Sequence, residues 1–467
     1  MKKLFIILLW GICFCFNLVA QPSMTLYQMH DIPQSNTLNP AVPIQCGWIV
    51  GLPGLGGVSA GLSMPLSYND FGAGTDTLNV NNILSSLHNK NMVTTSASAN
   101  ILTVGYRANR TFYQFTINER FNQVSSISRD PIDLLLRGNG GYVGQTVKAS
   151  PSINATYYRE YAFNIAQEIN STFWIGARAK LLFGRMSMYS VNNSAEFYTH
   201  PNTYNLSLTS DVLVRTSVPG SVSINNQNGK VSDFDTNIKA GDFIFNPSNI
   251  GAGVDLGLTK EFESGMKISA SILNLGFINW NKNLHTFRQK GTLNFNGPFS
   301  YINELDALVD TVKTFLKLDY ENQASYTQML APMVMTGINY PVNDFLRVGI
   351  TGMVEFQPNV LPWVITATGF TKNLPFVDFG LSYTVTPYSF FNIGLGVGAH
   401  LGSVDIHVMT DNIIGALRPF DARYATFQFG LSFRLGQSEC DVQDSGVRGN
   451  RPSYRALPCP IINSPRR

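Results

Sequence analysis

The chain has 467 residues and a formal net charge of +3, and only 13% of its residues are charged, against roughly 25% in soluble domains. Aromatic residues make up 12% of the chain, and 40 residues are glycine. This composition argues against an ordinary soluble domain, and the small net charge argues against nucleic acid or another strongly charged partner.

The first 20 residues have the organisation of a secretory signal peptide. Lys2 and Lys3 are followed by an apolar run from Leu4 to Phe16, and Ala20 precedes the polar start of the mature chain. The run is too short to be a stable transmembrane anchor. We therefore expect export and cleavage after about Ala20, which lowers the formal net charge from +3 to +1.

Two segments flank the body of the chain. Residues 21–45 are polar and contain proline, which predicts a periplasmic or plug-like lead-in. Residues 436–467 are charged and proline-rich, which predicts a periplasmic tail. Its Cys440 and Cys459 are candidates for a disulfide in an oxidising compartment, although Cys46 leaves the pairing open.

Between residues 46 and 435, large apolar residues alternate with small or polar ones in segment after segment, which is typical of strands with two unlike faces. In the first half, after a glycine-rich β-forming stretch at 48–66 and a short helix or lid loop at 79–91, strands are expected at 100–107, 111–121, 152–167, 172–189, 204–216, 251–262, 265–274 and 285–295. In the second half, they are expected at 333–341, 345–356, 363–371, 377–386, 390–401, 404–410 and 424–435.

The last of these segments shows the alternation most clearly. Five large apolar residues, from Phe427 to Leu435, point to one face, and Gln428, Gly430, Ser432 and Arg434 point to the other. Because this pattern recurs behind a signal peptide, it predicts an all-β fold: a transmembrane antiparallel β-barrel of about 14 strands, within a range of 12 to 16. A secreted β-sandwich or β-helix is the soluble alternative, but no repeat of fixed period supports a β-helix.

Two connections interrupt the strands. Residues 217–249 form a long polar connection with the composition of a loop. Residues 302–318 instead show helical spacing of apolar residues, with charged residues on the opposite face, which predicts a short helical insertion. Its low cationic content favours packing on its own barrel over a position on the membrane surface.

Alternation also predicts which charged residues face the lumen. Both positive and negative residues occur in this set, so it indicates no selectivity for anions or cations. The simplest explanation of these charged residues is that they pair with one another and with the plug and so fill the interior. His400 and Asp405 face each other if Gly402-Ser403 is a turn, which gives a pH-sensitive contact or a simple hydrogen-bonded pair. The lumen-facing candidates are Arg178, Lys180, Asp255, Lys267, Arg347, Glu355, Asp378, His400, Asp405, His407 and Arg434.

Signatures of catalysis are weak. The mature chain has no Walker-type loop, His-Glu-x-x-His or Cys-x-x-Cys motif, and its six histidines have no metal-ligand spacing. We therefore expect a protein that is not an enzyme and that holds no metal or cofactor.

Three segments resemble known sequences. Thr37-Leu38-Asn39-Pro40-Ala41 resembles the lead-in of PorP/SprF-type outer-membrane proteins. Residues 269–280 and 418–423 resemble a related, mostly uncharacterised family of Bacteroidota outer-membrane barrels, and the likeness extends over nearly the whole mature chain. PorV- and FadL-like relatives of that family are 14-stranded barrels.

The resemblance implies a place in the outer membrane of a Gram-negative bacterium, in contact with outer-membrane lipid. The first function that it implies is a conduit or receptor for small molecules, apolar ones included. The alternative is a scaffold or accessory barrel of a type IX secretion or surface-anchoring complex, in which the tail binds periplasmic or secretion-complex proteins.

Overall fold

The computed structural model describes residues 23–42, 47–71, 78–219, 221–224, 231–235, 248–295, 319–321, 324–358, 360–371, 374, 376–418 and 420–435. The predicted signal peptide, the helical insertion at 302–318 and the tail with Cys440 and Cys459 lie outside these residues. Within them, no helix is both long and apolar enough to cross a membrane.

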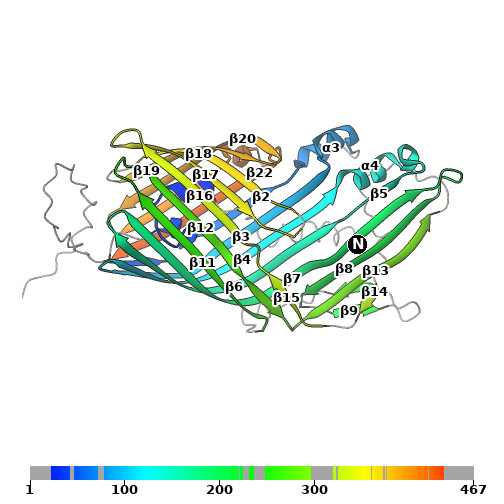
Figure 1. Cartoon of the computed structure of the whole chain (residues 1–467), viewed down its shortest axis with the longest axis horizontal. Helices are drawn as coiled ribbons and strands as arrows, with labels where there is room; N and C mark the ends of the chain where they lie inside the picture. The colour runs from blue at the N-terminus through cyan, green and yellow to red at the C-terminus, as the bar shows by residue number, and fades with distance from the viewer. Residues whose placement is uncertain are drawn as a thin grey trace, which may run out of the picture.

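The strands close into an antiparallel ring of 14 positions, which confirms the predicted barrel (Figure 1). The last strand, β22 (Tyr424–Leu435), closes the ring against β1 (Trp48–Gly51) and β2 (Val58–Ser63), which together fill one position. The other ring strands are β3 (Lys90–Ala108), β4 (Thr111–Ser128), β6 (Ser152–Asn170), β7 (Phe173–Thr199), β11 (Ile250–Glu261), β12 (Lys267–Trp280), β16 (Met333–Pro341), β17 (Leu346–Glu355), β18 (Trp363–Thr371), β19 (Val377–Thr386), β20 (Ser389–Leu401) and β21 (Val404–Thr410).

The two faces of the ring have opposite chemistry. In β19, Phe379 and Leu381 are exposed on the outside, while Asp378 and Ser382 are buried on the inside. Side chains of successive residues point to opposite faces of a strand, so one alternating sequence builds both surfaces. Exposed apolar side chains recur around the ring at Phe115, Phe163, Leu181, Leu256, Leu275, Ile338, Ile350, Ile365, Leu395, Val408 and Phe427.

The two ends of the ring differ in their connections. At the end that holds Trp48 and Leu435, here the turn end, strands are joined by short turns, and Asn109 (φ 51°) and Gly402 (φ 66°) adopt left-handed conformations that such turns require. The opposite end, here the loop end, carries long connections. They contain η2 (Tyr68–Phe71), α3 (Val80–Ser86), α4 (Arg129–Arg137), η3 (Asn139–Tyr142) and α7 (Ile413–Leu417).

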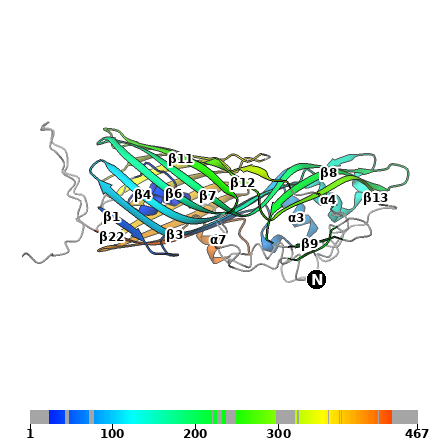
Figure 2. The ribbon, with the colours of Figure 1, turned by 90° about the horizontal axis from the view of Figure 1, so that it is seen from below.

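The same sheet continues beyond the loop end as a further group of strands, here the extension (Figures 1 and 2). The far half of β7 pairs with β8 (Leu206–Ser217), and β8 pairs with β13 (Leu284–Phe295). The expectation that 204–216 and 285–295 belong to the barrel wall is therefore wrong, because neither segment pairs with a ring strand other than this overhang of β7. Small strands complete this end: β5 (Thr146–Lys148), β14 (Asp319–Glu321) and β15 (Tyr326–Met329).

The polar connection at 217–249 also differs from the expected loop. It contains a two-stranded sheet of β9 (Ser221–Ile224) and β10 (Val231–Asp235).

Residues 23–42, here the plug, lie inside the ring and appear dark blue in Figure 1. The plug contains α2 (Met24–Gln28) and the 3-10 helix η1 (Pro33–Thr37). Pro33 is the first residue of η1. Proline favours this position because its φ angle is already helical and because it has no backbone N–H, which would lack a partner within the helix here. Almost all of the plug is buried, so it forms part of the interior of the barrel.

Candidate functional site

The plug begins at a carboxylate on the barrel wall. Asp411, which follows β21 and is fully buried, accepts hydrogen bonds from Ser23 Oγ (2.8 Å), Met24 N (2.8 Å), Thr25 N (3.1 Å) and Thr25 Oγ1 (2.6 Å). The first N–H groups of a helix have no partner within the helix, and a carboxylate is well suited to accept from them. This contact fixes the start of the plug in the lumen.

Beyond this contact, the plug packs against an apolar part of the wall. The cluster is unusually rich in methionine, whose flexible side chain fills irregular spaces. Its plug members are Met24, Leu26, Tyr27, Met29, Ile32 and Leu38, and its wall members are Leu273, Met333, Met335, Met353, Val364, Phe370 and Met409.

Glycines in the wall allow the plug backbone to approach closely. A Cβ at Gly337 would lie 2.7 Å from Gln28 Nε2 and 2.8 Å from Tyr27 Cε1, and a Cβ at Gly176 would collide with the backbone of Pro40. At these distances the added carbon would overlap its neighbours, so a larger residue at Gly176 would displace the plug backbone, and one at Gly337 would displace the side chains of Gln28 and Tyr27. The wall is thus shaped around the plug.

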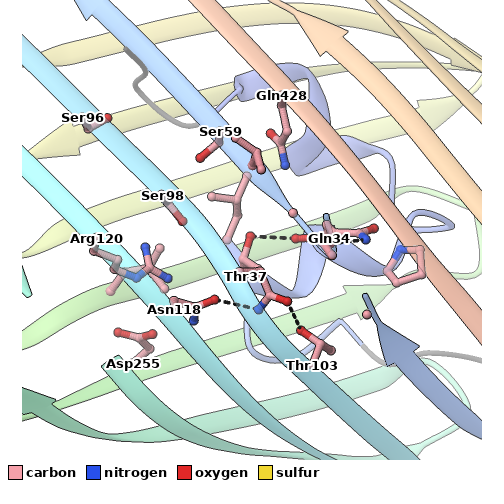
Figure 3. A pocket seen from close by; sticks show the side chains of 18 of the residues that line it. Gln34, Thr37, Ser59, Ser96, Ser98, Thr103, Asn118, Arg120, Asp255 and Gln428 are labelled. Atoms are coloured by element: carbon pink, nitrogen blue, oxygen red, sulfur yellow. Dashed lines mark hydrogen bonds between the residues drawn. The ribbon is translucent and has the colours of Figure 1, made fainter. Parts of the chain in front are cut away.

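On another side of the lumen, the wall and the plug do not meet, and a cavity of about 100 Å³ remains. Here called the lumen cavity, it lies between the plug and strands β2, β3, β4 and β22, with β12 at its edge (Figure 3). Its polar lining is formed by Gln34, Thr37, Ser59, Ser96, Ser98, Asn100, Thr103, Gln114, Asn118, Arg120, Asn122, Lys180, Asp255, Asn274, Gln428 and Ser432.

Five charged residues, here the charge network, meet beside this cavity, and three of them, Arg120, Lys180 and Asp255, line it. Lys180 Nζ lies 2.7 Å from Asp255 Oδ2 and 3.2 Å from Glu160 Oε2. Arg120 Nε lies 3.1 Å from Glu160 Oε2, and Arg178 Nη1 lies 3.2 Å from Asp255 Oδ2. The network therefore contains three cations and two carboxylates, which leaves one positive charge in excess.

The network also contacts the plug. Arg178 Nη2 donates to the carbonyl oxygen of Asn36 (2.6 Å) and to its side-chain oxygen (2.7 Å), at the C-terminal end of η1. Carbonyl oxygens at the end of a helix favour a cation. The charged wall thereby orients the second half of the plug.

A second cavity, of about 30 Å³, lies nearer to the loop end. It shares Asn122, Asn274 and Met333 with the lumen cavity and extends to Glu355 and Asn154. We call it the upper cavity. The two cavities together trace a polar region from the loop end down to the plug.

Four of the remaining charged residues predicted from alternation, His400, Asp405, Asp378 and Arg434, form one group. At the turn end, His400 Nδ1 lies 2.6 Å from Asp405 Oδ1, and His400 Nε2 lies 2.7 Å from Asp378 Oδ2. Arg434 bonds to Asp405 and donates to the backbone carbonyl of Asp31 in the plug (3.0 Å). This rim network is distinct from the charge network.

The other candidates do not form a single group. Arg347 Nε donates to Asn339 Oδ1 (2.8 Å), Glu355 faces the upper cavity, and Lys267 lies 3.7 Å from Glu261. His407 is buried against Gly430. Alternation alone does not indicate which lumen residues meet.

Three residues that matter for this site are absent from the predicted set: Arg120, Glu160 and Asp411. The alternation within 111–121 and 152–167 would have placed Arg120 and Glu160 opposite the outward Phe115 and Phe163. Asp411 lies just after a strand, and no periodic pattern indicates its role.

One segment has the spacing of a hydrolase nucleophile motif: Gly57-Val58-Ser59-Ala60-Gly61. That motif requires the serine in a sharp turn between a strand and a helix. Ser59 instead lies within β2, and no histidine lines the lumen cavity. Among the residues that the structure describes, no group of three His, Cys, Asp or Glu side chains could hold a metal ion.

Residues 40–411 match the model of a family of unknown function, DUF5723. Since the match covers most of the chain, the protein belongs to this family. Among curated proteins, none matches the chain significantly.

Several solved structures are similar to this chain. The toluene transporter TbuX of Ralstonia pickettii is 10% identical, with 87% of this chain and 94% of that chain covered and a TM-score of 0.40. A Pseudomonas aeruginosa FadL homologue is 9% identical, with 86% and 94% covered and a TM-score of 0.39. The translocator domain of the autotransporter NalP from Neisseria meningitidis is 6% identical, with 88% and 100% covered and a TM-score of 0.32. Likeness at this level concerns the architecture alone.

Proposed function

We propose that this member of the DUF5723 family is a non-enzymatic outer-membrane barrel that receives small polar solutes at its loop end and conducts them past the plug. The observation that carries the proposal is the lumen cavity, which lies against the plug and shares Asn122, Asn274 and Met333 with the upper cavity. Pockets with convergent polar groups are the usual sites of small ligands. The amides, hydroxyls and charged groups that converge on the cavity, next to apolar side chains such as Leu38 and Leu273, favour a solute that can form hydrogen bonds over a purely apolar one.

The outer surface of the ring supports a position of this barrel in a membrane. Apolar side chains such as Ile350 (56% exposed), Leu381 (60%) and Phe391 (63%) would be unfavourable in water. A bilayer removes this cost, and a closed ring satisfies the backbone without water. Short turns on one side and long loops on the other support a periplasmic turn end and an external loop end.

A planar-bilayer experiment tests this function. The full-length protein is expected to conduct poorly, because the plug fills most of the lumen, whereas a variant that lacks residues 24–38 is expected to show large, steady conductance. Osmotic swelling of liposomes in arabinose should then be faster with the deletion variant than with the full-length protein. Equal, negligible conductance of the two proteins, when both are folded, would contradict the proposal.

The extension supports a second candidate function, a scaffold for a surface or secretion complex. It has its own apolar core, which includes Leu134, Phe197, Leu206 and Leu208. A conduit does not require such a module beyond the membrane. Co-purification of a partner with the full-length chain, and its loss when the extension is replaced by a short loop, would support this candidate; type IX secretion remains a prediction that the comparisons do not address.

A further inference from the structure

Several polar atoms that line the lumen cavity have no hydrogen-bond partner among the described residues. They include Gln34 Oε1, Gln428 Oε1, Ser96 Oγ and Ser432 Oγ. Gln428 is 6% exposed and Ser432 is 1% exposed, so bulk water does not reach them freely. Because buried polar groups are nearly always paired, these atoms indicate that something polar occupies the cavity.

The types of these atoms restrict the occupant. Amide oxygens only accept hydrogen bonds, whereas serine hydroxyls can donate or accept. A solute hydroxyl also does both, so a molecule with several hydroxyls can satisfy the whole set. Leu38 and Leu273 lie on the same lining and would contact the C–H surface of such a molecule.

The size of the cavity indicates more than a single water molecule. Its volume is about 100 Å³, whereas one water needs only about 10–15 Å³ on the same kind of measure. The cavity therefore accommodates several water molecules or one solute of about the size of a monosaccharide.

The charge network restricts the charge of the occupant. Arg120 and Lys180 both line the cavity, and the network carries one positive charge in excess of its two carboxylates. Hydrogen bonds between ionised partners are the stronger kind, so an occupant with one negative charge is favoured beside this excess positive charge over a neutral or cationic one.

We propose that the lumen cavity binds a hydroxyl-rich, monoanionic solute of monosaccharide size, that is, a sugar acid. This inference rests on the proposed function and names the class of solute that the conduit selects. Gln428 and Ser432 would bond to solute hydroxyls, while Arg120 and Lys180 would favour the carboxylate.

Calorimetric titration of the full-length protein in detergent micelles tests the class of solute. The probes are galacturonate, galactose and galactosamine at neutral pH, which share a skeleton and differ in charge. Galacturonate is expected to bind about tenfold more tightly than galactose, because charge-assisted hydrogen bonds are the stronger kind, and galactosamine is expected not to bind. Absence of galacturonate binding, or equal affinity for the three sugars, would overturn the proposal.

A pair of variants tests the location. Gln428→Leu removes the amide with little change in volume and is expected to weaken galacturonate binding about tenfold. The control is Thr366→Val, a substitution in β18 of a buried hydroxyl that does not line the cavity. If Gln428→Leu does not fold, Ser432→Ala is measured instead. Wild-type affinity in the folded cavity variant would overturn the location.

The outcome is separable from that of the conduit. Tight sugar binding by the full-length protein, together with negligible bilayer conductance of the variant that lacks residues 24–38, would leave the site in place and refute conduction. Passage without sugar binding would leave the conduit in place and refute the site.

Discussion

The two sides of the lumen hold the plug in different ways. On the side of β16 to β19, here the packed side, Met335, Met353 and Phe370 contact the plug without a gap. On the side of β2 to β4, here the open side, amides and hydroxyls face a cavity instead. The difference indicates that one side fixes the position of the plug, while the other leaves space for a solute.

The largest effect on how the plug is held is expected from a substitution of Asp411. Replacement by alanine leaves four buried donor groups of the plug without their acceptor. Because each orphaned buried donor costs about 1–3 kcal/mol, the variant should lose roughly 4 kcal/mol or more and release the start of the plug. Chymotrypsin digestion in detergent, which can cleave a released plug after Tyr27, and bilayer conductance would both report this release. A plug that stays protected in the variant would show that Asp411 is not an anchor.

The next effect is expected at Met335, which is fully buried on the packed side. Met335→Ala removes the side chain from the contact with the plug and should lower the free energy of unfolding by about 2–5 kcal/mol. Urea unfolding of the protein in lipid vesicles measures the change. Thr336→Ala, on the outward face of the same strand, is the control and should have a much smaller effect.

A substitution at Gly337 tests the packed side in the opposite way, because it adds an atom to the contact with the plug instead of removing atoms. Gly337→Ala places a Cβ against Gln28 and Tyr27 and should cost about 1–3 kcal/mol through overpacking. Gly352→Ala is the matched control, because its Cβ would be 3.8 Å from its nearest neighbour, Thr336 Oγ1. Similar stability of the two variants would mean that the plug yields easily on its packed side.

The smallest effect is expected on the open side. Ser98 lines the cavity, and its replacement by alanine removes no packed neighbour. Ser98→Ala should change the free energy of unfolding by no more than about 0.5 kcal/mol. Urea unfolding in lipid vesicles measures this change. A decrease in the free energy of unfolding as large as that of Met335→Ala would show that the cavity is a structural element and not space for a solute.

The barrel was predictable because its signal is local. Alternation with a period of two places Arg178 and Lys180 on one face and Leu181 on the other, and this needs no knowledge of the rest of the chain. The expectation of a plug-like lead-in likewise followed from composition.

Pairing partners could not be predicted in the same way. Residues 206–217 alternate like the ring strands, yet they pair with the overhang of β7 and with β13, and nothing within the segment distinguishes the two situations. The charge network is also non-local, because it joins residues of β4, β6, β7 and β11 that are far apart in sequence.

The contact between Asp411 and the plug has a consequence for the order of folding. The plug is among the first described parts of the chain, but its acceptor is 386 to 388 residues further on. Contacts of such sequence separation form late, because they require a large loss of chain entropy before they give any stabilisation. A chain that ended before β21 could neither close the ring nor hold the plug. The plug can therefore take its place only after the whole wall has been synthesised and assembled.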